Sequence, residues 1–190
     1  GGDGTVIANG TVSATGTNGI GIFAQSQGTP GYNGTVAVTV AATVTGGSGT
    51  AATSSQSGAA GVWIDGGNSS NTVTVASGAA LATGLGTGGT AILQTGDGVA
   101  TVNNSGTVTG AAYLNGGGFN NVNSGTHNTG SINDGDVAND GVLNIGLSDE
   151  IRATRVTGDF VQTAKGQLGV TIHSLAGSAD RLEIDGSASI

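Results

Sequence analysis

The densest group of ionisable side chains in this sequence is acidic, because Asp134, Asp136 and Asp140 lie within seven residues. Hard cations such as Ca²⁺ prefer carboxylate and carbonyl oxygens, so this spacing raises the question of a calcium site. The ligand spacing of an EF-hand is absent, however, and the Gly-Gly-x-Gly-x-Asp repeats of calcium-binding β-rolls do not recur. Aspartates in turns commonly hydrogen-bond their own backbone. We therefore predict turn residues here, with no metal and no cofactor.

Nucleophilic catalysis by serine needs a histidine base and an acid within hydrogen-bond reach of the nucleophile. The two histidines, His127 and His173, lie in separate segments, His127 in an Asn/Thr-rich stretch and His173 just after an expected strand. Both are predicted to be solvated turn residues. The run from Gly96 to Gly98 has glycine where a Gly-Asp-Ser-Gly nucleophile motif has serine. The sequence therefore predicts no enzyme.

Charge is distributed unevenly along the chain. Residues 1–150 contain eight acidic and no basic residues, whereas residues 151–190 contain four of each sign, the basic ones being Arg152, Arg155, Lys165 and Arg181. An arginine base therefore does not coincide with the acidic cluster, which disfavours a polysaccharide lyase. Phosphate contacts need clustered Lys and Arg, so the net charge of −8 argues against nucleic acid as a partner. The split suggests two segments, 1–150 and 151–190.

Three aromatic residues, Phe23, Trp63 and Tyr113, occupy equivalent places in short strands that begin with glycine. Stacked aromatics can bind sugars. Aromatic residues make up only 3% of the chain, however, so large side chains are scarce. We expect these three to fill a thin core or one face of it.

The elements that must position these residues are short strands. The chain has 39 Gly and one Pro in 190 residues, and its charged share is only 8%. Apolar residues alternate with polar ones at Val73 and Val75 and again at Leu168, Val170 and Ile172, which is the period of a strand. No 3.6-residue stripe and no run of about 18 apolar residues occurs, so neither helices nor membrane insertion is expected. A mean hydropathy of +0.10 also tells against disorder.

Imperfect repeats select among the all-β architectures. Gly-Thr-Val begins at Gly4, Gly10, Gly34 and Gly106. A sandwich uses longer strands with large core residues, and a propeller carries aromatic blade signatures that are missing here. The sequence predicts one right-handed parallel β-helix of roughly seven to nine coils, given the usual inter-coil spacing of about 4.8 Å. Asparagines are expected to form side-chain ladders between coils: Asn103, Asn104, Asn120, Asn121, Asn123 and Asn128.

The last stretch carries a more specific pattern: a Gly-Asp-aromatic start, a Gln, a turn Gly, alternating apolar residues, a polar loop, and a second alternating run. The residues that match in order are Gly158, Asp159, Phe160, Gln162, Gly166, Leu168, Val170, Ile172, Asp180, Leu182, Ile184, Gly186 and Ala188. This pattern resembles the C-terminal end of the passenger domain of Gram-negative autotransporters, which use type V secretion. The match covers about 33 residues. The upstream repeats resemble that family in their general pattern and not in a specific motif.

The resemblance implies a non-catalytic, extracellular passenger segment, a structural stalk or adhesin at the bacterial cell surface. Residues 151–190 would then be autochaperone-like terminal coils that aid folding and secretion, with a translocator β-barrel downstream that anchors the full-length protein in the outer membrane. Its partner would be a host surface protein or glycan, or another copy through self-association. A polysaccharide-binding or polysaccharide-cleaving β-helix remains the alternative. The longer apolar residues of the tail also predict that it is the more stable segment, and open terminal coils predict end-to-end association.

Overall fold

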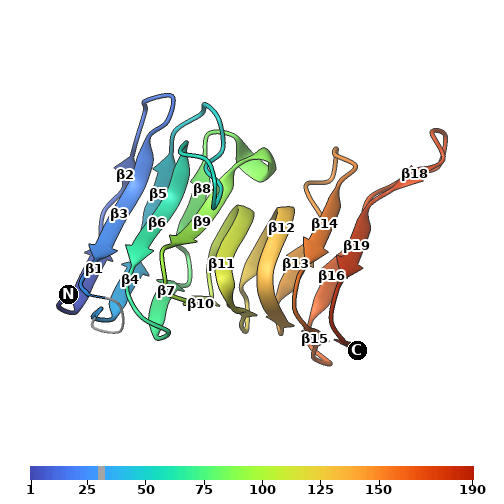
Figure 1. The fold of residues 1–190 in the computed structure, drawn as a ribbon. Coiled ribbons are helices and arrows are strands. Elements are labelled where there is room, and N and C mark those ends of the chain that lie inside the picture. The colour runs from blue at the N-terminus through green and yellow to red at the C-terminus, as the bar shows by residue number, and fades with distance from the viewer. Residues whose placement is uncertain (30–32) are drawn as a thin grey trace.

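The chain folds into a single stack of short parallel strands (Figure 1). The computed structural model describes residues 1–29 and 33–190, and 57% of the chain lies in strands against 2% in helix. Successive coils pair in parallel from β1 (Gly4–Ala8) onward, so the all-β, right-handed parallel β-helix that the sequence predicts is confirmed.

The parallel strands belong to one sheet of 18 strands, which winds around the stack so that each coil has three faces. The first coil is β1, β2 (Val12–Ser13) and β3 (Ile20–Ser26). These pair with β4 (Val36–Val40), β5 (Thr43–Gly46) and β6 (Ala60–Gly66) in the second coil. The third coil is β7 (Asn71–Val75), β8 (Ala80–Thr83) and β9 (Thr90–Thr95), with the short 3-10 helix η1 (Gly86–Gly88) between the last two.

Two long strands carry the chain around corners in the middle of the stack. β10 (Ala100–Asn104) leads into β11 (Thr107–Asn121) and β12 (Thr126–Asn139), which pair with each other through two register shifts. Glycine makes this close approach possible: at Gly135, φ is +126° and a Cβ would lie 1.9 Å from the carbonyl oxygen of Gly117. The stack then continues through β13 (Val142–Asn144), β14 (Ala153–Val156), β15 (Phe160–Gln162), β16 (Gln167–Gly169), β19 (Arg181–Ile184) and β20 (Ala188–Ser189).

Inward-facing side chains form ladders along the axis because every coil repeats the same alternation. One ladder is apolar throughout and joins Val6, Val38, Val73, Val102, Phe119, Val137 and Phe160. From Val38 to Phe160 its members are fully buried. A second ladder begins with Ala8, Val40 and Val75 and changes to amides at Asn104.

The amide part of that ladder is a chain of hydrogen bonds inside the coil. Asn104 Nδ2 donates to Asn121 Oδ1 (2.9 Å), Asn121 Nδ2 to Asn139 Oδ1 (2.9 Å), and Asn139 Nδ2 to Gln162 Oε1 (3.0 Å). Outside the core, Asn120 bonds Asn103 and Asn128 bonds Thr109 and Asn144. The predicted ladders are thus present, whereas Asn123 adopts a positive φ of 52° in a turn.

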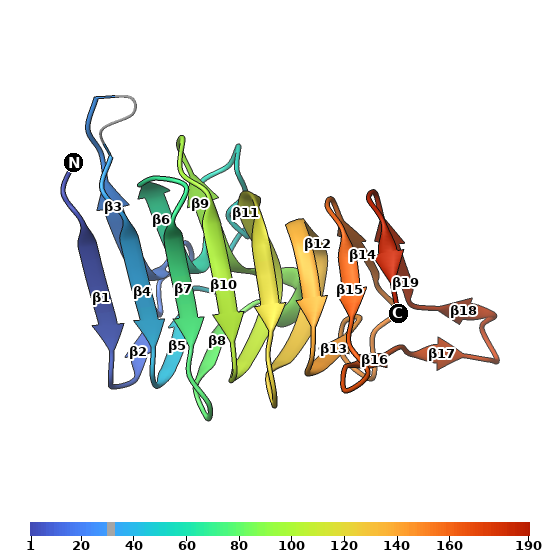
Figure 2. The same cartoon turned by 90° about the horizontal axis from the view of Figure 1, so that it is seen from below.

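The C-terminal coils bury less apolar surface than the body of the stack. Only Thr154, Val156 and Phe160 are fully buried after position 150. An antiparallel hairpin, β17 (Ile172–His173) with β18 (Ser178–Ala179), projects from the last coil (Figure 2). Leu175 at its tip is fully exposed. Ile172 and Leu175, two of the longer apolar residues behind the predicted stability of the tail, lie on this hairpin and away from the core.

Candidate functional site on the outer face

The register brings the three predicted aromatic residues into one row. Phe23 pairs with Trp63, Trp63 with Leu93, and Leu93 with Tyr113 across β3, β6, β9 and β11. Their neighbours Ile22, Val62 and Ile92 point into the core, so this row points outward. The aromatics do not fill the inner core: Trp63 and Tyr113 pack with Leu93 in a second, smaller cluster on the outer face, and Phe23 is 52% exposed.

The indole of Trp63 is held in a fixed orientation. Its Nε1 donates to Thr95 Oγ1 (2.8 Å), and that hydroxyl donates in turn to Asp65 Oδ1 (2.8 Å). The ring of Phe23 meets it edge-on, with centroids 5.8 Å apart and an interplanar angle of 81°. These contacts leave part of the indole accessible while restricting its rotation.

The Asp65 carboxylate is the centre of the polar row beside the aromatics. Gln25 Nε2 and Gln27 Nε2 both donate to its Oδ2 at 2.7 Å, in addition to the Thr95 hydroxyl on Oδ1. These three hydrogen bonds occupy both oxygens of the carboxylate. Asp65 therefore holds the side-chain amides of Gln25 and Gln27 in place at the surface.

A hollow of about 240 Å³ opens between Trp63, Thr95 and the loop 53–57. The loop contributes Thr53, Ser54, Ser55, Gln56 and Ser57. Ala52 N donates to Ala59 O (2.9 Å) and closes the base of the loop, and the Thr90 hydroxyl donates to Ala52 O (2.5 Å) and ties that base to β9. Sequence reasoning missed this loop; its only signal is a run of hydroxyl and amide residues between two strands.

The predicted tail residues fall into two groups. Phe160 closes the apolar core ladder, Gln162 ends the amide ladder, and Leu182 and Ile184 pack against the core. Gly158, Gly166 and Gly186 lie so close to the preceding coil that a Cβ would come within 2.4 Å of another atom. Leu168, Val170 and Ile172 are instead exposed, at 38%, 52% and 69%.

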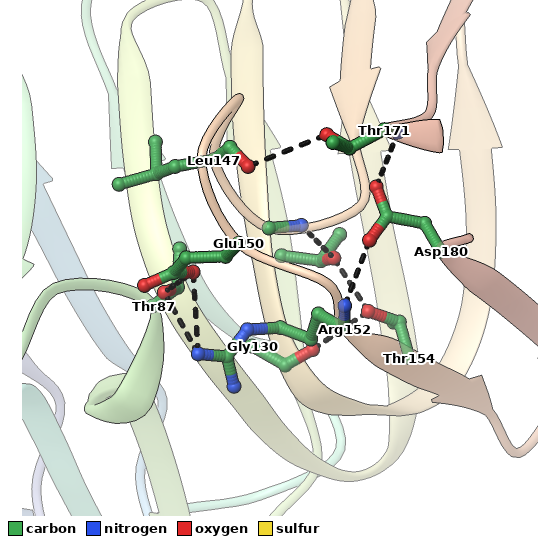
Figure 3. A network of polar contacts seen from close by, with 10 residues as sticks. Thr87, Gly130, Leu147, Glu150, Arg152, Thr154, Thr171 and Asp180 are labelled. Atoms are coloured by element: carbon green, nitrogen blue, oxygen red, sulfur yellow. Dashed lines mark hydrogen bonds and ion pairs between the residues drawn. The ribbon is translucent and has the colours of Figure 1, made fainter. Parts of the chain in front are cut away.

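Asp180, another residue of the tail pattern, joins the hairpin to the stack (Figure 3). Its Oδ1 accepts from Arg152 N (2.7 Å) and its Oδ2 from Thr171 N (2.6 Å). Arg152 Nη2 also reaches Thr87 Oγ1 (3.0 Å) in η1 and Glu150 Oε2 (3.3 Å). The hydrogen bond from Thr87, followed by Arg152, lowers the pKa of Glu150. This network fixes the connection between β13 and β14 onto an earlier coil.

His127 is not the solvated turn residue that the sequence predicts. It is fully buried in β12, and its ring stacks on Phe119 with centroids 4.1 Å apart and planes 11° apart. Its Nε2 lies 3.2 Å from Gly110 O, and its buried Nδ1 has no hydrogen-bond partner. Burial lowers its pKa to about 4. The prediction was wrong because the Asn and Thr residues on either side of His127 occupy outward positions of β12, while His127 occupies an inward one. His173 is exposed.

The three aspartates bond groups of adjacent coils. Asp134 Oδ1 accepts from Thr157 Oγ1 (3.1 Å), and Asp136 Oδ1 accepts from Asp159 N (2.8 Å). Asp140 accepts from the Thr163 hydroxyl. Among residues 1–29 and 33–190, no three His, Cys, Asp or Glu side chains gather in a way that could hold a metal ion. These hydrogen bonds join one coil to the next, whereas the sequence predicted turn aspartates that bond their own backbone.

Comparison of the chain with protein families, with curated proteins and with solved structures returns no match. Within the part of the chain that the structure describes, no helix has the length and apolar character needed to cross a membrane.

Proposed function

We propose that the chain is a non-catalytic stalk segment of a bacterial cell-surface passenger protein, with an adhesive outer face. The observation that carries the proposal is the uninterrupted apolar ladder from Val38 to Phe160, in register from coil to coil. Such a stack is a quasi-one-dimensional rod whose length grows with the number of coils. A rod of this kind holds a binding surface away from its point of attachment.

We further propose that residues 151–190 act as an autochaperone-like end of the rod. Three contacts support this role: Gln162 completes the amide ladder, Phe160 completes the core, and Asp180 ties the hairpin to Arg152. Parallel coils form slowly because each needs non-local pairing. A terminal coil with fixed backbone contacts gives the preceding coils an edge on which to form.

The test is surface display from a fusion. Residues 1–190 are placed between a signal sequence and a heterologous outer-membrane translocator in Gram-negative cells. Antibody labelling of intact cells should show the chain outside, in a protease-resistant form. Asp180→Ala should reduce the resistant fraction, because two backbone N–H groups lose their acceptor, whereas Glu183→Ala, in an exposed ion pair with Arg181, should not. Equal resistance of both variants would contradict the role of the tail.

The alternative of polysaccharide cleavage has less support than polysaccharide binding. Glycoside hydrolysis commonly uses a pair of carboxylates, and no residue that lines the hollow at Trp63 is acidic. Binding has a specific observation in its favour, which is the hollow at Trp63.

A further inference from the structure

We infer that the hollow between Trp63 and the loop 53–57 binds a neutral carbohydrate. This inference deepens the adhesive part of the proposed function by naming the class of ligand, and it rests on that function only for its biological meaning. The hollow combines an aromatic wall, a polar rim and an absence of positive charge among its lining residues.

The wall is the accessible part of the indole. Sugar rings carry apolar C–H faces and polar edges, so they are bound by an aromatic surface with hydrogen-bonding groups around it. Trp63 is half-buried and fixed by its bond to Thr95 and by the edge-on ring of Phe23. A side chain that is already immobilised loses little rotamer freedom when a ligand arrives, which favours binding.

The rim supplies hydroxyl and amide groups on two sides. The loop side offers Ser54, Ser55 and Gln56, all exposed to solvent. The strand side offers Thr95, whose hydroxyl accepts from Trp63 Nε1, donates to Asp65 Oδ1 and keeps one lone pair as an acceptor. Hydroxyls and amides both donate and accept, which matches the hydroxyl groups of a sugar.

Charge selects against acidic sugars. No residue that lines the hollow is charged, and the adjacent carboxylate of Asp65 is negative. The sequence supplies no Lys or Arg before position 150, so a uronate, sialic acid or sulfated sugar would meet only like charge in these coils. The favoured ligand is therefore an uncharged hexose or N-acetylhexosamine unit of a glycan.

The chain contains its own reporter, because Trp63 is its only tryptophan. Purified protein is titrated with maltoheptaose, cellopentaose, mannopentaose, N-acetylchitopentaose and lacto-N-tetraose while indole emission is recorded. Sialyllactose and tetragalacturonate serve as charged probes. We expect a saturable change with at least one neutral oligosaccharide and none with the charged ones. No saturable change with any neutral probe, or equal binding of a charged probe, would overturn the inference.

Variants then locate the site by calorimetry with the oligosaccharide that binds. Ser55→Ala combined with Gln56→Ala keeps the reporter and alters only exposed loop side chains, and it should weaken binding several-fold. Trp63→Phe should weaken it about tenfold or more, as truncation of an aromatic anchor does. Ile7→Ala is the matched control, since Ile7 is an exposed apolar residue (57%) on β1, which lies on another face of the stack. Unchanged affinity in the loop variant would place binding elsewhere and refute the site. Surface display tests the stalk proposal, and titration of the purified protein tests the glycan site. Failure of one can therefore be told from failure of the other.

Discussion

Mild acid should destabilise this β-helix through one buried side chain, His127. The neutral ring donates from Nε2 to Gly110 O, which leaves Nδ1 as the atom that a second proton must occupy. Nδ1 is buried and has no acceptor for that proton, and the ring lies between Val108 and Leu143 of the adjacent coils. The folded state therefore disfavours imidazolium, and the unfolded chain does not.

The size of the effect follows from the two pKa values. Burial lowers the pKa of His127 from 6.5 to about 4 in the folded protein. Between these values the unfolded chain binds a proton that the folded chain does not, so stability rises with pH and is lost as the pH falls from 6.5 towards 4. At 1.36 kcal/mol per pKa unit, the full loss is about 3 kcal/mol, of which about 2 kcal/mol appears by pH 5.

The measurement compares wild type with His127→Leu by urea unfolding, followed by circular dichroism, from pH 7.5 to pH 5. This range stays above the pI of about 4.1. At pH 7.5 the variant should be less stable by about 1 kcal/mol, because it loses one hydrogen bond. At pH 5 it should be the more stable protein by about 1 kcal/mol. Wild type has by then lost about 2 kcal/mol because its unfolded chain binds a proton at residue 127, and leucine binds none. His173→Gln, at an exposed position, should follow wild type. Parallel pH profiles for wild type and His127→Leu would refute the argument.

Three further results are expected. Asn121→Ala should lower the free energy of unfolding by about 3 kcal/mol, because Asn104 and Asn139 lose their partner in the buried ladder, whereas Asn120→Ala on the outer side should cost less than about 1 kcal/mol in the same urea experiment. Gly135→Ala should cost more than about 2 kcal/mol by thermal melting, because its Cβ would meet Gly117 O, and Gly118→Ala, with open space around it, is the control. Backbone amides of the hairpin, residues 172–179, should exchange with deuterium faster than those in β4–β10, since the hairpin projects from the stack and its residues bury little surface; the opposite order would contradict the burial argument.

Local sequence determined the class of fold. Val73 and Val75 alternate with threonine, glycine fills the turns, and no 3.6-residue period is present, so only short strands can bury the apolar residues. The same regularity predicted the asparagine ladders and the alignment of Phe23, Trp63 and Tyr113, because a parallel stack places equivalent residues of successive coils one above another.

The tertiary structure alone decided which side of each strand faces the core. His127 lies among Asn and Thr residues in the sequence, yet its position in β12 is an inward one, which the register with Val108 fixes. Trp63 takes an outward position although large apolar residues are scarce, because Val62 and Ile64 already fill the inner positions beside it. The hollow at Trp63 depends on how the loop 53–57, which precedes β6, folds back beside the indole. A period of two divides residues into two faces but does not say which face is inside, and a one-residue shift exchanges them.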